Sequence, residues 1–298
     1  RDREYAELKR LLTPKEYASA RASTLNAHFT SYTVINSIYS ALENMGFKGG
    51  KILEPALGTG NFFGSMPEEM RNNSKLSGVE LDSITGRIAK LLYPSANIQI
   101  KGYENTTFEN NSFDIAVSNV PFGSYKVNDK DYNNQNMYIH DYFFAKALDQ
   151  VRPGGVIAFI TSKGTLDKQN PSVRRYIAAR ADFLGAIRLP DTTFKASAGT
   201  EAVADIIFLQ KRDRMIECDP DWCHLGKDEN GIEMNQYFVG HPDMVLGSMV
   251  TESGPFGPQT TCKPFADMEL SELLSEAVSN IHSEAVSYTH LRAHETRG

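Results

Sequence analysis

The sequence predicts an α/β fold with a doubly wound, mostly parallel sheet of seven strands and an N-terminal helical extension. Two observations support this fold class. Short apolar runs alternate with longer amphipathic segments as far as Arg212, and a glycine-rich turn directly follows the first apolar run. Because crossover helices join parallel strands, this alternation is typical of a parallel sheet covered by helices. The 298 residues, of which 41% are hydrophobic, are enough to bury such a core.

The first elements are expected to be helices. Residues 3–23 place apolar side chains at helical spacing, with Pro14 as a break or as a first-turn residue of a second helix. A polar connector over residues 26–31 leads into a third helix over residues 32–45, which has one apolar face. Gly46 follows where a C-terminal cap belongs, so this helix is expected to end there and lead into the sheet.

Seven apolar runs are expected to form the strands. Each run is short and bounded by polar or turn-forming residues, as buried strands are. Only a short loop rich in glycine, serine and threonine separates the last two runs, so we expect them to pair antiparallel at one edge of the sheet. In chain order the runs cover residues 51–53, 76–79, 98–100, 113–118, 156–160, 184–188 and 204–209.

The turn after the first predicted strand carries a candidate ligand site. Gly58 and Gly60 permit backbone torsions and a close approach of a ligand that a Cβ atom would block. Phe63 occupies the third glycine position of a dinucleotide fingerprint, and Glu54 would repel a pyrophosphate. Glu54 suits a positively charged amino group instead. The residues expected to bind the ligand here are Glu54, Pro55, Ala56, Gly58, Thr59, Gly60, Asn61 and Phe62.

The second predicted strand ends in a further acid. Glu80 lies about twenty residues after Gly60, where a carboxylate can accept hydrogen bonds from both ribose hydroxyls. Together with Glu54 it indicates a nucleoside with a cationic tail, which describes S-adenosylmethionine. Leu81, the next residue, is expected to contact the same ligand.

The fourth predicted strand runs directly into Asn119-Val120-Pro121-Phe122, at the same sheet edge as the glycine turn. The side-chain oxygen of Asn119 and the carbonyl of Val120 could accept the two hydrogens of a conjugated amine and favour the charge that develops during methyl transfer. Pro121 makes the turn rigid, and Phe122 offers a face on which a base can stack. We therefore expect these four residues to be catalytic.

These motifs resemble the amino-methyltransferase superfamily, whose members carry an acid-Pro-x-x-Gly-x-Gly loop and an Asn/Asp-Pro-Pro-aromatic motif. The resemblance implies the S-adenosylmethionine-dependent methyltransferase fold, with the motif order of the branch that methylates N6 of adenine. It also implies that Phe29 and Thr30 belong to the first cofactor-contacting segment, and that Glu104 binds the cofactor's adenine amine. The departure is Val120 in place of the usual first proline.

A narrower resemblance is to the methylase portion of large helicase-methylase proteins of phages and conjugative elements. It rests on the stretch 24–29, on Asn119-Val120-Pro121-Phe122-Gly123 and on the segment from Tyr237 to Pro242. Those relatives also contain a helicase motor, and this sequence has no Gly-x4-Gly-Lys-Ser/Thr loop. The resemblance implies DNA as the substrate, with the target adenine flipped out or unpaired, and a helicase portion outside this chain.

Other functions remain open. A protein-glutamine N5 methyltransferase or an RNA adenine methyltransferase needs the same pair of hydrogen-bond acceptors. A non-catalytic module that binds nucleic acid or a partner protein is a third alternative. The net charge of −6 disfavours unaided DNA binding, because affinity for phosphates comes mostly from lysine and arginine. Basic residues outnumber acids in one stretch, which could form a basic face and comprises Lys163, Lys168, Arg174, Arg175, Arg180 and Arg188.

Composition limits the remaining possibilities. No apolar run approaches the roughly 18–20 residues of a membrane span, and the first residues do not form a signal peptide, so a cytoplasmic location is expected. Three cysteines are too few for a disulfide framework. Cys218, Cys223 and His224 lack the paired spacing of a four-ligand zinc site, and no metal is expected.

We expect four segments along the chain. Residues 1–31 form the helical segment with the first cofactor contact, and residues 32–212 form the methyltransferase domain. Residues 213–285 are acidic and rich in turns and are expected to form a peripheral appendage. Residues 286–298 lack periodicity and look like translated sequencing-adaptor read-through, so they are not expected to belong to the fold.

Overall fold

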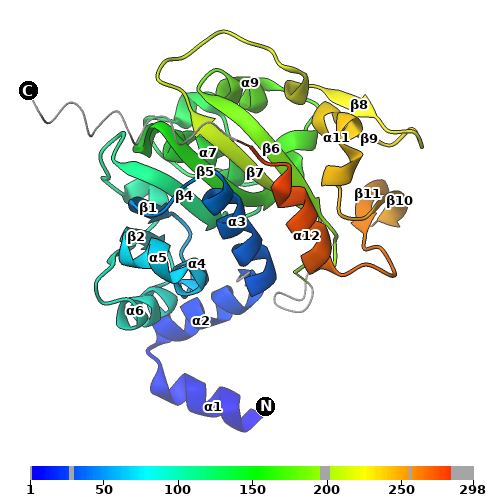
Figure 1. The fold of residues 1–298 in the computed structure, drawn as a ribbon. Helices are drawn as coiled ribbons and strands as arrows, with labels where there is room; N and C mark the ends of the chain where they lie inside the picture. Colours follow the sequence, from blue (N-terminus) through cyan, green and yellow to red (C-terminus); the bar gives the residue numbers. More distant parts are fainter. Residues whose placement is uncertain (1, 27–29, 195–201, 255–256, 283–298) are drawn as a thin grey trace, which may run out of the picture.

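A seven-stranded sheet forms the centre of the computed structural model, which describes residues 2–26, 30–194, 202–254 and 257–282 (Figure 1). The strand order is β3-β2-β1-β4-β5-β7-β6. Neighbouring strands are parallel except β7, which is antiparallel to both β5 and β6. All seven predicted strands are confirmed: β1 (Lys51–Glu54), β2 (Lys75–Glu80), β3 (Asn97–Ile100), β4 (Phe113–Asn119), β5 (Val151–Ser162), β6 (Ala181–Leu189) and β7 (Ala204–Lys211).

The central strands are apolar on both faces. Adjacent residues, whose side chains point to opposite faces, are fully buried on β4 (Ala116 and Val117) and on β5 (Phe159 and Ile160). Helices cover both faces, as this pattern requires. In Figure 1, α3 (Tyr32–Asn44) and α12 (Leu270–Ser279) pack side by side in front of the sheet, and α7 (Ile139–Gln150) and α9 (Ser172–Ala178) lie behind it. This arrangement confirms the predicted fold class.

Short helices follow the strands whose carboxyl ends share one sheet edge. They are α4 (Asn61–Ser65) and α5 (Glu68–Asn72) after β1, α6 (Ser83–Leu92) after β2, and α8 (Gly164–Asp167) after β5. Single 3-10 turns, η1 (Tyr103–Asn105) and η2 (Asn133–Gln135), lie in the connections after β3 and β4. In the part of the chain that the structure describes, no helix is long and apolar enough to span a membrane.

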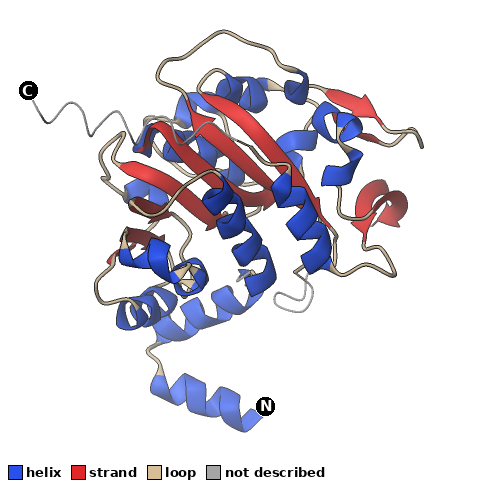
Figure 2. Ribbon diagram, viewed as in Figure 1, coloured by secondary structure: helices blue, strands red, loops and turns tan. Residues whose placement is uncertain are grey.

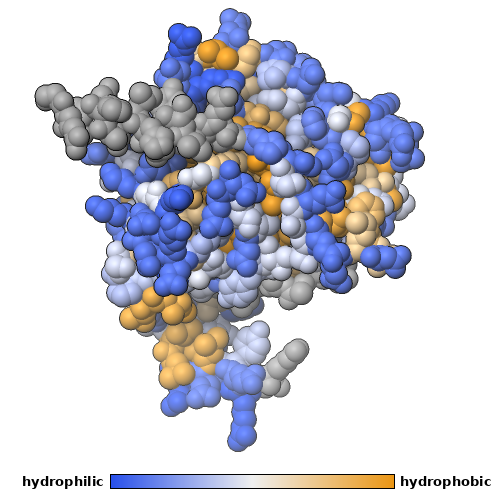
Figure 3. All heavy atoms as spheres, viewed as in Figure 1, coloured by the Kyte–Doolittle hydropathy of each residue, from blue (hydrophilic) through white to orange (hydrophobic). Residues whose placement is uncertain are grey.

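The N-terminal helices also follow the sequence pattern. Pro14 is the first residue of α2 (Pro14–Asn26), which follows α1 (Asp2–Leu11). Ser31 caps α3 by accepting a hydrogen bond from the backbone N–H of Val34, and Gly46 follows the helix with φ of 81°. Exposed apolar side chains gather on α1 and over α6, at the lower left of Figure 3, and include Tyr5, Leu8, Leu11, Ile88, Leu91 and Leu92.

The C-terminal segment shares the core of the sheet. Trp222, Phe238 and Leu274 are buried in the same apolar cluster as the central strands. This packing is closer than a peripheral appendage would have. Figure 2 shows the segment's small strands at one end of the sheet, whereas α12 lies in front of the sheet beside α3. The elements are η3 (Asp221–Cys223), β8 (Leu225–Lys227), β9 (Glu233–Asn235), α11 (Gln236–Gly240), η4 (Pro242–Met244), β10 (Ser248–Gly254), β11 (Gly257–Lys263) and α12. The predicted segment boundaries stay predictions, and residues 286–298 lie outside the described residues.

Three of the six residues of the predicted basic face do not offer a free charge at the surface. Arg174 and Arg188 are almost completely buried, where burial of a guanidinium requires partners. Arg174 donates to backbone carbonyls, including that of Cys223, and Arg188 pairs with Asp205 at 2.8 Å. On the surface, Arg175 forms a two-point ion pair with Asp219. These arginines stabilise the fold, and the count of charges along the sequence could not show their burial.

Candidate functional site

The glycine turn and the Asn119 motif meet at one edge of the sheet. Strand β1 lies between β2 and β4, so the turns that follow these three strands are neighbours. A cavity of about 60 Å³ opens between them. Its walls join residues from the turn after β1, from the end of β4 and from the segment before α3, namely Thr30, Glu54, Ala56, Leu57, Gly58, Thr59, Asn61, Phe62 and Asn119.

Glu54, the last residue of β1, is an acid buried in the wall of this cavity. Its side chain is 2% exposed, and its Oε2 atom is buried without a hydrogen-bond partner among the described residues. Burial, and secondly the nearby charge of Glu80, raise the pKa of the Glu54 carboxyl well above its ordinary value of 4.5. A buried carboxyl oxygen without a partner destabilises the fold until a cation or a hydrogen-bond donor binds to it. The cavity has space for such a group next to Glu54.

Glu80, the last residue of β2, clamps the glycine turn. Its Oε2 accepts a hydrogen bond of 2.7 Å from the backbone N–H of Gly58, and its Oε1 accepts one of 2.7 Å from that of Asp82. Burial raises the pKa of Glu80, and these two backbone donors oppose the shift. Each carboxylate oxygen keeps a second lone pair, so the same side chain can accept hydroxyl groups of a ligand.

The two glycines of the turn have different tasks. Gly60 has φ of 87°, and a Cβ atom there would lie 2.4 Å from Cε2 of Tyr93, whose hydroxyl donates to the Gly60 carbonyl at 2.8 Å. Gly58 has φ of 57°, and a Cβ atom there would meet no described atom within 4 Å. Gly60 therefore packs against the protein, whereas Gly58 faces open space in the cavity.

Asn119 closes the other side of the cavity. Its Nδ2 atom donates a hydrogen bond of 3.0 Å to Oγ1 of Thr30. The backbone N–H of Val120 donates to the carbonyl of Ile160 at 3.0 Å, and the Val120 side chain is buried in the core. Phe122 is half-buried against the same core. The strand pairing of β4 and β5 thus fixes the backbone of the motif, and Thr30 fixes the amide plane.

Several predicted contacts are not part of this cavity. The Leu81 side chain is 76% exposed, and Glu104 is half-buried, with its carboxylate accepting a hydrogen bond from Asn105 at 2.8 Å. Pro55 and Gly60 belong to the turn but do not line the cavity. Four further predicted site residues lie beside the cavity without lining it: Glu80, Val120, Pro121 and Phe122. Phe29 lies outside the described residues. Leu57, which was not among the predicted site residues, does line the cavity.

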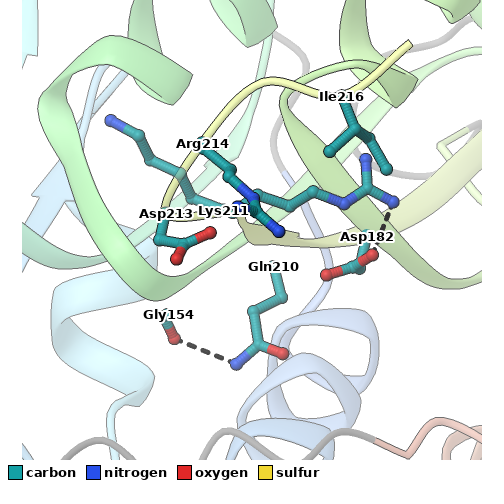
Figure 4. A pocket seen from close by; sticks show the side chains of 8 residues that line it. Gly154, Asp182, Gln210, Lys211, Asp213, Arg214 and Ile216 are labelled. Carbon is teal, nitrogen blue, oxygen red and sulfur yellow. Dashed lines mark hydrogen bonds and ion pairs between the residues drawn. The ribbon is translucent and has the colours of Figure 1, made fainter. Parts of the chain in front are cut away.

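A second, larger cavity of about 270 Å³ lies at the opposite edge of the sheet, where β5 and β6 begin and β7 ends (Figure 4). Four of its polar side chains already have partners within the protein. Arg212 pairs with Asp182 at 2.5 Å, Gln210 donates to the carbonyl of Gly154, and Lys211 donates to the carbonyl of Val151. The glycine turn and the Asn119 motif lie at the other sheet edge, so this cavity is not the candidate site.

Metal ligands are not assembled in the described ranges. No group of three histidine, cysteine, aspartate or glutamate side chains there has an arrangement that could hold a metal ion. Cys218, Cys223 and Cys262 are free thiols, and burial raises the pKa of Cys223 to about 11.

The fold is shared with solved methyltransferases. A class I S-adenosylmethionine-dependent methyltransferase from Listeria monocytogenes has a TM-score of 0.53 at 20% identity, over 64% of this chain and 62% of that one. A methyltransferase subunit of a type I restriction-modification system from Streptococcus thermophilus has a TM-score of 0.52 at 15% identity, over 86% and 58%. At these identities the similarity shows the fold alone.

Sequence comparison identifies the family. The chain is 31% identical over 196 residues to the "Defense against restriction protein B" of Escherichia phage P1, a match that covers 63% of this chain and 8% of that protein. The chain therefore spans about 8% of the length of this curated relative. The sequence profile described as "N-6 DNA Methylase" matches residues 12–224, which is most of the chain. The chain therefore belongs to the N-6 DNA methylase family.

Proposed function

We propose that this chain transfers the methyl group of S-adenosylmethionine to N6 of adenine in DNA. The observation that carries the proposal is the shared cavity, in which a buried, unsatisfied acid and the amide of Asn119 line the same walls. Family membership supports the same reaction class.

The residues in the cavity, and Glu80 beside it, fit the cofactor. The unpartnered Oε2 of Glu54 is suited to the cofactor's ammonium group, which would compensate the buried carboxylate. Glu80 already accepts two backbone donors and can accept the ribose hydroxyls with its remaining lone pairs. A side chain at position 58 would project into this space, and glycine leaves it open. When bound, the cofactor supplies an electrophilic methyl group.

Asn119 and Val120 then act on the acceptor amine. The lone pair of an aromatic amine is delocalised into its ring, which makes the nitrogen a weak nucleophile. Because Nδ2 of Asn119 donates to Thr30, the amide presents Oδ1 as its acceptor. Hydrogen bonds from the amine to this oxygen and to the Val120 carbonyl favour a pyramidal nitrogen and stabilise the positive charge that develops during transfer. Proximity and orientation supply the remaining rate enhancement.

The adenine must leave its stack to reach this cavity, so we propose a flipped-out or unpaired target base with Phe122 as a stacking face. The net charge of −6 makes unaided duplex binding weak. The phage P1 relative is much longer than this chain, which supports the proposal that further portions deliver the DNA. We propose a helicase portion as one of them.

An acceptor survey tests the proposal. Purified chain with tritiated S-adenosylmethionine is incubated separately with duplex DNA, single-stranded DNA, RNA and a protein extract, and label is counted in each polymer. We expect incorporation into DNA, highest where adenines are unpaired. Label that enters only protein would support glutamine methylation instead. Label that enters only RNA would identify RNA, and not DNA, as the substrate. A folded chain that binds cofactor but labels nothing would favour the non-catalytic alternative.

A further inference from the structure

The loop that connects the end of β4 to the start of α7 is unusually long. It runs from Val120 to Tyr138, begins inside the Asn119 motif and contains only the single turn η2. Loops longer than about 12–15 residues without regular structure are usually functional or disordered. The contacts of this loop decide between these two possibilities.

Buried polar contacts hold the loop in place. Asp129 is buried and accepts hydrogen bonds from Lys146 at 2.8 Å and from Tyr142 at 2.7 Å. Although burial raises the pKa of Asp129, these two partners bring it below the ordinary value, so the carboxylate is charged. The Tyr132 hydroxyl donates to Asp149 at 2.5 Å. The loop is therefore fixed to α7, and its outward side chains have defined positions.

Tyr125 lies directly against the end of the catalytic motif. A Cβ atom on Gly123 would come within 2.5 Å of Cε1 of the Tyr125 ring, so the ring covers the chain one residue after Phe122. The Tyr125 carbonyl accepts a hydrogen bond of 2.9 Å from the backbone N–H of Ile139. The ring is nevertheless 55% exposed. An aromatic face is thus held open beside the expected position of the acceptor.

Tyr138 places a second exposed ring near Tyr125, at the other end of the same loop. It precedes Ile139, the residue whose backbone holds Tyr125, and it is 36% exposed. The Lys168 ammonium lies 4.5 Å from the centre of the Tyr138 ring and pairs with Asp141. Two lysines, Lys126 and Lys130, are exposed on the same loop, whereas Asp131 is the one acid exposed there. This loop therefore combines aromatic faces with an excess of cations.

We propose that Tyr125 and Tyr138 form a stacking rim that binds the nucleotides flanking the target adenine in single-stranded DNA. Aromatic faces combined with cations are the chemistry that binds single-stranded nucleic acid, because every base has a face to stack and every linkage has a negative phosphate. The bases must be unpaired to offer these faces, which agrees with a target outside the helix. The inference rests on the proposed function and adds a site of DNA contact.

The test measures binding of a fluorescein-labelled single-stranded deoxyoligonucleotide by anisotropy at low salt. We expect Tyr125→Ala and Tyr138→Ala each to weaken binding roughly 5- to 150-fold, as the loss of one stacked base predicts. Tyr125→Phe and Tyr138→Phe keep the ring and are expected to bind within about twofold of the wild type. Tyr5→Ala, which removes a ring that is 59% exposed on α1, is the matched control and is expected to change nothing.

Methyl transfer is measured on the same oligonucleotide, with cofactor affinity and melting temperature recorded for each variant. The KM for DNA is expected to rise in the two alanine variants while the cofactor Kd stays within about twofold. Alanine variants that bind like the wild type, or phenylalanine variants that lose as much as alanine variants, would overturn the stacking rim while transfer by the wild type still upholds the proposed function. Tighter, tyrosine-dependent binding of RNA would overturn DNA as the partner. Absence of wild-type transfer would overturn the proposed function itself and the inference with it.

Discussion

Thr30 and Asn119 are joined by a hydrogen bond of 3.0 Å, although 89 residues separate them along the chain. Thr30 precedes α3 and belongs to the segment that the resemblance assigns to the cofactor, whereas Asn119 ends β4 and begins the motif assigned to the acceptor. One contact therefore connects the two halves of the proposed site. It also determines which way the Asn119 amide faces.

This contact predicts a positioning role for Thr30. Thr30→Val removes the hydroxyl with little change in volume, so the Asn119 amide loses its partner and can rotate. We expect turnover to fall about 10- to 100-fold, because small misplacements at a reacting centre have effects of that size. Single-turnover transfer with tritiated cofactor gives the rate, and calorimetry gives the cofactor Kd.

Thr30→Ser is the matched control, since it keeps the hydroxyl and is expected to retain most of the turnover. A Thr30→Val variant with unchanged turnover would show that the amide does not need this partner. A loss confined to cofactor affinity would indicate a cofactor contact in place of a positioning role.

The two glycines of the turn are expected to respond differently to alanine. Both have left-handed torsions, which cost about 1–2 kcal/mol for a residue with a Cβ atom. Gly58→Ala adds no clash with the protein, so its main effect should be a loss of cofactor affinity. Gly60→Ala also drives a methyl group into Tyr93 and is expected to lower the free energy of unfolding by about 2–5 kcal/mol.

Urea denaturation and cofactor calorimetry on both variants separate these effects. If the Gly58→Ala protein binds the cofactor as tightly as the wild type, the glycine turn does not belong to the cofactor site. Equal destabilisation by the two substitutions would show that Tyr93 does not brace Gly60.

Glu54 is expected to make the unliganded protein less stable as pH rises. Its raised pKa means that the native state keeps a proton at pH values where the unfolded chain has lost it, so stability falls as pH increases above about 4.5. Each pH unit in that window costs about 1.4 kcal/mol while the carboxyl stays protonated. Glu54→Gln removes this dependence and should raise the free energy of unfolding at pH 7.

The same substitution should weaken cofactor binding, because the amide cannot compensate an ammonium group. Cofactor binding by the wild type is expected to release a proton at pH values where the unliganded Glu54 carboxyl is still protonated, since a cation beside Glu54 lowers the pKa of that carboxyl. Calorimetry in buffers of different ionisation enthalpy measures the proton. Equal proton release by the wild type and by Glu54→Gln would assign it to another group.

Local sequence patterns were sufficient for the sheet and the glycine turn. Each strand is a short apolar run, and the two acids at the ends of β1 and β2 follow from the order of strand, turn and helix. The positions of Gly58 and Glu80 relative to these strands fixed their place at one sheet edge. These features depend on residues close in sequence, and they are predictable for that reason.

Contacts between distant segments were not predictable. Nothing near Arg188 indicates that Asp205 and Asp167 neutralise it in the interior, so the sequence left a basic face open where the structure has a buried ion pair. Tyr93 behind Gly60 and Trp222 in the sheet's core depend likewise on how separate elements pack. A single sequence carries no signal for such pairings.

Asn119→Ala is expected to leave cofactor binding within about twofold and to reduce transfer by at least about 100-fold, the usual effect of removing one preorganised group at a charge that develops in the transition state. Calorimetry and tritium incorporation into DNA check the two quantities. Asn119→Asp keeps an acceptor oxygen and is expected to retain part of the activity. Equal labelling of DNA by Asn119→Ala and the wild type would show that the Asn119 side chain takes no part in the reaction.

The most direct test of the account is the identity of the methylated product. DNA that contains unpaired adenines is incubated with the purified chain and S-adenosylmethionine, digested to nucleosides and examined by mass spectrometry beside a reaction with Asn119→Ala. The account predicts N6-methyl-2′-deoxyadenosine in the wild-type reaction and almost none with the variant. A different methylated nucleoside, or no methylated nucleoside from a folded chain that binds the cofactor, would contradict it.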